Sequence, residues 1–190
     1  MLGKPFLNSI NSKKETVSFL FSLNNSYQFS QTVSSSCENN ISCEKKYSNI
    51  SASILLKSGF ELVSGKYMSN NNGKLAYTGM AYHIKKRKFG IGLHFTSYKH
   101  ELINFYTSKP RETGISLHLR FRKSMVKPYI YYSRALMYND TQPLEFFVFG
   151  ATTRLNNFVF STFVNTYIEN NFNINTENAK MNITIGVLLD

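Results

Sequence analysis

Apolar and polar residues alternate along most of this chain with a period of two. In the clearest run, residues 89–96, large apolar side chains take every odd position and small or polar ones take every even position. The apolar members are Phe89, Ile91, Leu93 and Phe95. A helix would scatter such residues around its axis, whereas a strand places them on one face. The pattern therefore predicts a strand with two chemically different faces.

The same alternation divides the chain into nine segments, and all of them are predicted to be strands. They are 16–33, 47–68, 74–84, 89–98, 115–122, 129–138, 144–155, 158–168 and 181–189. The first two are each long enough for one strand or two. Within the second, Lys57-Ser58-Gly59 fits a hairpin with Gly59 in the left-handed conformation. The total is thus nine to eleven strands.

Strand length and the spacing of turns favour a barrel that crosses a membrane. Several segments run to about ten residues, which is close to what a tilted strand needs to span a bilayer. The short turns 85–88, 124–127 and 156–157 interleave with the longer loops 99–112, 139–143 and 169–179. The aromatic residues near strand ends are interpreted as interfacial girdle residues, with ordinary strand packing as the alternative. They are Tyr98, Phe105, Tyr106, Tyr129, Tyr138, Phe158 and Tyr167.

We therefore predict an all-β fold, an antiparallel up-and-down transmembrane β-barrel over residues 16–190. Residues 1–15 are predicted to form an N-terminal tail or plug. Single-chain bacterial barrels have an even number of strands. We predict eight strands as best suited to the length, with ten as the alternative. A soluble up-and-down barrel, with its aliphatic faces turned inward onto an apolar ligand, is the rival fold.

Composition agrees with a barrel and adds a strong positive charge. The 190 residues are 15% aromatic, with a mean hydropathy of −0.26, and only alternate residues of a membrane barrel need to be apolar. No apolar run is long enough for a transmembrane helix, and the first residues carry no signal-peptide pattern. A mature form, or a chain that uses no secretory route, would explain this start. The net charge of +11 favours anionic partners, either lipid and lipopolysaccharide or nucleic acid.

Across residues 16–189 the pattern resembles the small outer-membrane β-barrel proteins of Gram-negative bacteria. The resemblance implies an outer-membrane location and a bilayer as the main partner. Such barrels often end in a strand with a terminal aromatic residue, whereas this chain ends Leu188-Leu189-Asp190.

If the aliphatic faces point to lipid, a set of basic residues points into the lumen. The candidates for the lumen or for an anion site are His94, His118, Arg120, Arg122 and Arg154. Glu61, Glu145 and Glu177 are the carboxylates expected to balance them. Cys37 and Cys43 share one polar loop and can close a disulfide in an oxidising compartment.

The predicted function is structural, adhesive or complex-forming, with the loops 34–46, 99–112 and 169–179 as contact surfaces, including contacts within a membrane protein complex. A narrow anion-preferring channel and the soluble ligand-binding barrel are the alternatives. We expect no enzyme, although a lipid-modifying barrel enzyme stays open, and no cofactor or metal site. We also expect no nucleic-acid partner, because the aromatic residues share faces with Ile, Leu and Val.

Overall fold

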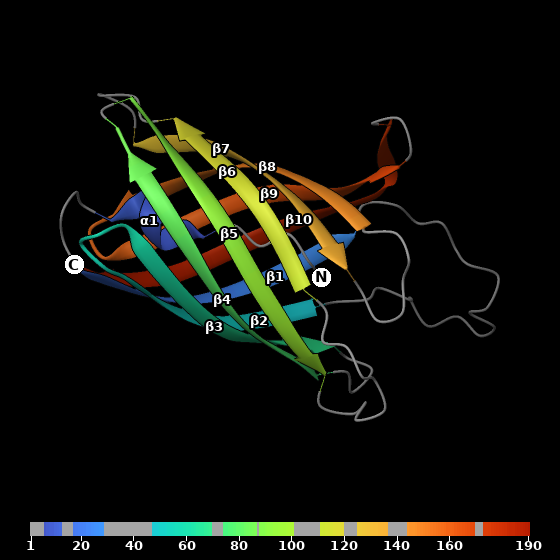
Figure 1. Cartoon of the computed structure of the whole chain (residues 1–190), viewed down its shortest axis with the longest axis horizontal. Helices are drawn as coiled ribbons and strands as arrows, with labels where there is room; N and C mark the ends of the chain where they lie inside the picture. The colour runs from blue at the N-terminus through green and yellow to red at the C-terminus, as the bar shows by residue number, and fades with distance from the viewer. Residues whose placement is uncertain are drawn as a thin grey trace.

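The protein forms a closed antiparallel barrel of ten strands in the computed structural model (Figure 1). The strands are β1 (Ser18–Gln28), β2 (Tyr47–Leu55), β3 (Phe60–Ser69), β4 (Lys74–Lys85), β5 (Phe89–His100), β6 (Arg111–Leu119), β7 (Val126–Leu136), β8 (Leu144–Leu155), β9 (Phe158–Glu169) and β10 (Asn173–Leu189). Each pairs with its neighbours in sequence, and β10 pairs with β1 to close the barrel. The structure describes residues 6–12, 17–28, 47–69, 74–86, 88–100, 111–119, 125–136, 144–169 and 173–190.

The prediction of eight strands is wrong, and the alternative of ten is confirmed. The segment 47–68 is two strands, β2 and β3, whereas Ser18–Gln28 of the segment 16–33 is one strand. At the β2–β3 turn Gly59 has a φ of 92°, and its N–H donates to Leu56 O at 3.0 Å. A three-residue turn leaves Leu56 and Phe60 in the same phase, which is why alternation alone did not separate the two strands.

The two ends of the barrel differ in their connections. The strand ends joined by the β2–β3, β4–β5 and β8–β9 turns lie at one end, here called the turn end, where β1 begins and β10 finishes. The strand ends that flank 29–46, 101–110 and 137–143 lie at the opposite end, here called the loop end, and these three connections lie outside the described residues. β10 begins at Asn173, inside the predicted loop 169–179, and its pairing with β9 is irregular between Asn175 and Lys180.

The outer surface of the barrel is a continuous apolar band. Leu93 is 58% exposed, and large apolar residues point outward on every strand. From Phe89 to Ser97, eight steps of about 3.3 Å at a tilt of about 45° cover roughly 19 Å along the barrel axis. Outer-membrane barrels carry an apolar band of about 25 Å. The soluble alternative required these faces to turn inward, and that orientation is wrong.

A short helix, α1 (Leu7–Asn11), lies at the turn end beside β1, β2 and β8 (Figure 1). Its five residues are all buried, and so are Phe6 and Ser12 on either side of it. Within the described ranges, no helix is long and apolar enough to cross a bilayer.

Candidate functional site

The lumen of the barrel is the candidate site, and α1 fills its turn end. A helix this short gains little from its own hydrogen bonds, so its position depends on contacts with the barrel wall. Asn8 Nδ2 donates to Ser18 O at 3.1 Å, and Ser18 Oγ donates to Asn8 Oδ1 at 2.7 Å. On β8, three strands away around the barrel, Thr152 Oγ1 accepts from Asn11 Nδ2 at 3.0 Å. The segment is thus attached to β1 and β8 at once.

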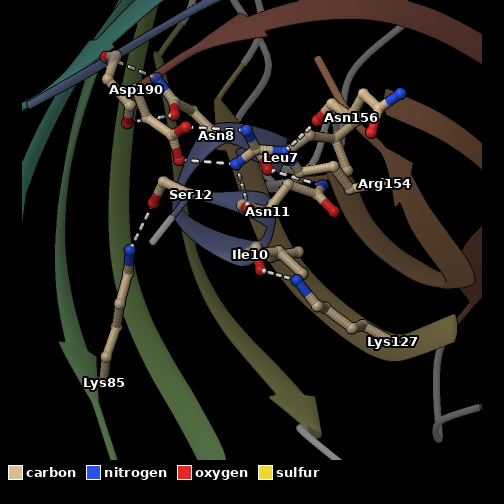
Figure 2. A network of polar contacts seen from close by, with 11 residues as sticks. Leu7, Asn8, Ile10, Asn11, Ser12, Lys85, Lys127, Arg154, Asn156 and Asp190 are labelled. Carbon is tan, nitrogen blue, oxygen red and sulfur yellow. Dashed lines mark hydrogen bonds and ion pairs between the residues drawn. The ribbon is translucent and has the colours of Figure 1, made fainter. Parts of the chain in front are cut away.

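Three cationic side chains at the turn end donate to oxygens of this N-terminal segment (Figure 2). The bonds are Lys85 Nζ to Ser12 Oγ (2.6 Å), Lys127 Nζ to Ile10 O (3.1 Å) and Arg154 Nη1 to Asn11 O (3.3 Å). They come from β4, β7 and β8, so the segment is held from several sides of the barrel. Cations suit these positions because carbonyls at the end of a helix lack partners within it.

Arg154 also joins the two ends of the chain. Its guanidinium forms a bidentate pair with the Asp190 carboxylate, with N–O distances of 2.6 and 2.7 Å, and its Nε donates to Asn156 O at 2.6 Å (Figure 2). One side chain therefore binds α1, the β8–β9 turn and Asp190, which follows β10.

Behind α1 a layer of imidazole and aromatic rings closes the middle of the lumen. The Phe6 ring packs against His94, with 4.5 Å between ring centroids, and against His83 at 6.1 Å. His83 Nε2 lies 3.0 Å from Glu61 Oε2, and the same carboxylate oxygen accepts the Ser9 N–H at 3.2 Å. Glu61 thus connects α1 to the wall through buried groups.

Toward the loop end, a tyrosine layer fills the lumen around a buried carboxylate. Tyr98 and Tyr131 both donate to Glu112, the latter at 3.0 Å. Tyr77 stacks between Tyr67 and Tyr98, with ring centroids 5.0 and 5.9 Å away. Ala135 and Phe146 complete the apolar cluster at this level.

Between α1 and the tyrosine layer lies a cavity of about 20 Å³. Its lining includes Phe6, Leu20, Glu61, Tyr77 and Thr96. A water molecule needs roughly 10–15 Å³ of such space, so the cavity holds little more than one. At this level the described side chains of the lumen are closely packed.

The basic residues singled out from the sequence lie at separate levels of the barrel. His94 and His118 face the lumen, and His94 Nε2 lies 2.6 Å from Ser116 Oγ. His118 stands across from Gly90 in the β5–β6 pairing, and Arg154 lies at the turn end. Arg120 and Arg122 lie outside the described residues, as do Cys37 and Cys43. The anion site and the disulfide therefore stay predictions.

Sequence reasoning misplaced some residues and missed others. Tyr98 and Tyr129, interpreted as interfacial, are buried in the lumen, since each shares the phase of the inward residues of its strand. Glu145, expected inside, faces outward and pairs with Arg134 at 3.1 Å. The side chain of Glu177 lies outside the described residues.

Glu112 was missed because it was assigned to the loop 99–112. It continues the even-numbered inward phase of Ser116 and His118, so extending that alternation toward the N-terminus would have found it.

Comparison with known proteins yields no family model and no curated protein that matches. Several solved structures are similar in outline. The KdgM porin in complex with disordered oligogalacturonate has a TM-score of 0.48 at 9% identity, over 92% of this chain and 98% of that one. CdiB from Acinetobacter baumannii has a TM-score of 0.44 at 12% identity, over 77% of this chain and 34% of that one, so the chain spans about a third of CdiB. A mutant porin of Rh. blastica has a TM-score of 0.28 at 8% identity, over 92% and 100%. The function therefore has to be argued from this chain's own residues.

Proposed function

We propose that this protein is an outer-membrane β-barrel with a closed lumen, and that it acts as a structural, adhesive or complex-forming component. The observation that carries the proposal is the filled lumen. Two barriers, α1 with its cationic contacts and the tyrosine layer around Glu112, leave a cavity of only about 20 Å³ between them. A barrel closed in this way acts through its loops and its outer surface.

The proposal places the barrel across a bilayer, with the turn end on the periplasmic side and the loop end outside. The apolar band supports the embedding, because in water it would expose large hydrophobic residues on every strand. The loops within 34–46 and 99–112 are the proposed contact surfaces for protein partners. Anionic lipid is the proposed partner of the outer wall, given the net charge of +11.

The proposed role is not enzymatic. His94 and Glu112, the groups most suited to acid–base chemistry, already bind Ser116, Tyr98 and Tyr131 inside the packed lumen. A substrate would have to displace these partners to reach them.

The second candidate function is a gated anion-preferring channel. It is favoured by the attachment of α1, which is held to the wall by hydrogen bonds of side chains and not by strand pairing. If the segment left the lumen, Lys85, Lys127 and Arg154 would line the turn-end opening as a ring of cations.

Conductance in planar bilayers separates the two functions. We expect the full chain to insert without forming steady channels. A variant with Lys85→Gln, Lys127→Gln and Arg154→Gln loosens α1, and we expect it to remain closed as well, because the tyrosine layer still fills the loop end.

The control locks α1 in place through Asn11→Cys with Thr152→Cys, in a background with Cys37→Ser and Cys43→Ser. Steady conductance in the loosened variant, abolished when the cysteine pair is added to that variant and oxidised, would establish the channel and refute the closed barrel.

A further inference from the structure

The outer wall of the barrel carries a cluster of cations at the loop-end edge of the apolar band. Lys66 on β3 and Lys99 on β5 are both directly paired with Ala76 on β4, so all three lie on one cross-strand row. Strands two apart are separated by about 10 Å, and the small Ala76 side chain leaves the space between the two lysines uncovered. Arg111 on β6 pairs with Ser97, diagonal to Lys99, and adds a third charge.

Arg134, another outward residue near the loop end, pairs with the Glu145 carboxylate at 3.1 Å and lies outside this cluster. The outward positions of β3, β4, β5 and β6 contain no Asp or Glu within the described residues, because Glu61 and Glu112 face the lumen. The cluster of Lys66, Lys99 and Arg111 therefore forms a local surplus of positive charge.

Directly on the turn-end side of this cluster, an apolar groove of about 540 Å³ crosses the outer wall. Its floor is a row of small residues that pair across four neighbouring strands. They are Ala52, Ser64, Thr78 and Ser97. Its walls are large apolar side chains, namely Phe19, Phe21, Leu62, Met80 and Phe95. The strands β2, β3, β4 and β5 are consecutive neighbours in the sheet, and Figure 1 shows β4 and β5 on the near face of the barrel.

The order of these features along the barrel axis matches the order of groups in a lipid. The cations lie where the apolar band ends, at headgroup level, and the groove lies within the band, at acyl-chain level. Lys and Arg at such a boundary extend their charged ends toward the headgroups while their stems cover apolar surface. Phosphate is the anion that three clustered cations of this kind recognise best.

We propose that Lys66, Lys99, Arg111 and the adjacent groove bind an anionic lipid of the loop-side leaflet, with its phosphate on the cations and an acyl chain in the groove. The inference rests on the proposed membrane embedding and names the lipid partner and its site. The shared chemistry is a phosphate-bearing headgroup, which phosphatidylglycerol and lipid A both carry.

The experiment is native mass spectrometry of the full chain in a neutral detergent, titrated separately with lipid A, phosphatidylglycerol and phosphatidylcholine. We expect retention of lipid A or phosphatidylglycerol and little retention of phosphatidylcholine. Each cation near a membrane surface contributes about five-fold in affinity, so Lys66→Gln, Lys99→Gln and Arg111→Gln together should weaken binding about 100-fold. Which anionic lipid is retained identifies the headgroup.

Two further variants test the contribution of the clustered cations and the contribution of the groove separately. Arg134→Gln removes an outward cation that lies outside the cluster and pairs with Glu145, and binding should stay within about two-fold of the original protein. Ser64→Leu with Thr78→Leu fills the groove on a lipid-facing surface, where extra apolar side chains are tolerated, and should weaken binding while leaving the cations in place.

Equal retention of all three lipids, or equal loss in the triple variant and in Arg134→Gln, would overturn the lipid site while the barrel stays a membrane protein. A chain that is monomeric in buffer without detergent would overturn the membrane embedding itself. Circular dichroism and gel mobility before and after boiling establish for each variant that the barrel has formed, so a loss of binding is read only from folded protein.

Discussion

Replacing Glu112 by leucine is expected to destabilise the barrel by about 2–6 kcal/mol, the cost of leaving two buried hydroxyl donors without an acceptor at about 1–3 kcal/mol each. Tyr98 donates to one carboxylate oxygen of Glu112, and Tyr131 donates to the other at 3.0 Å. All three side chains are at most 2% exposed, so water cannot replace the lost partner. Leucine keeps much of the volume of glutamate, and the loss therefore reports on hydrogen bonding more than on packing.

The measurement is urea unfolding in a fixed detergent, followed by circular dichroism. The chain has twelve tyrosines and no tryptophan, so tyrosine fluorescence gives a second signal from the same layer. Glu112→Gln keeps one acceptor oxygen and should cost about half as much as leucine, roughly 1–3 kcal/mol.

The decisive control removes the donors together with the acceptor. The triple variant Glu112→Leu, Tyr98→Phe and Tyr131→Phe buries no unmatched hydroxyl at this site, and it should recover most of the stability lost in Glu112→Leu. A triple variant no more stable than Glu112→Leu would mean that the carboxylate acts through contacts other than these two hydrogen bonds.

The outer wall was predictable from the sequence because the outer face and the lumen of a barrel impose different demands on alternate residues. From residue 89 to residue 95 the large apolar residues and the residues between them alternate without exception. The structure places the apolar set, Phe89, Ile91, Leu93 and Phe95, on the outside. The lumen was harder, since a packed interior accepts both polar and aromatic side chains. Tyr98 and Tyr129 follow the inward phase, yet their chemistry equally suits a membrane interface. The position of a residue in the alternation predicted the direction of its side chain better than its residue type did.

The contacts of α1 could not be predicted in the same way. Lys85, Lys127 and Arg154 are far apart in sequence and sit beside three different turns. They converge on one short segment only because the barrel closes with ten strands, and the strand number was the quantity that alternation left open. Local pattern determines which way a residue faces, whereas closure determines which residues meet.

Replacing Gly59 by alanine is expected to cost about 2–6 kcal/mol, from backbone strain of about 1–3 kcal/mol and overpacking of similar size. Gly59 has a φ of 92°, a conformation that side-chain-bearing residues avoid. A Cβ there would lie 2.5 Å from the carbonyl oxygen of His83 on β4. That oxygen belongs to the backbone and cannot rotate away, so the hydrogen bond from His83 N–H to Gly59 O, at 2.9 Å, would be strained too.

The control for Gly59→Ala is the other hairpin turn with a positive φ. Asn156 has a φ of 52°, within the region that asparagine tolerates. Asn156→Ala should cost only the left-handed strain, about 1 kcal/mol, and Asn156→Gly should be close to neutral. The midpoint of urea unfolding in one detergent compares the three variants directly. If Gly59→Ala lost no more stability than Asn156→Ala, the close approach of the β2–β3 turn to His83 would be refuted. A clearly larger loss would establish that this turn is packed against β4, at the level where His83 and Glu61 support α1.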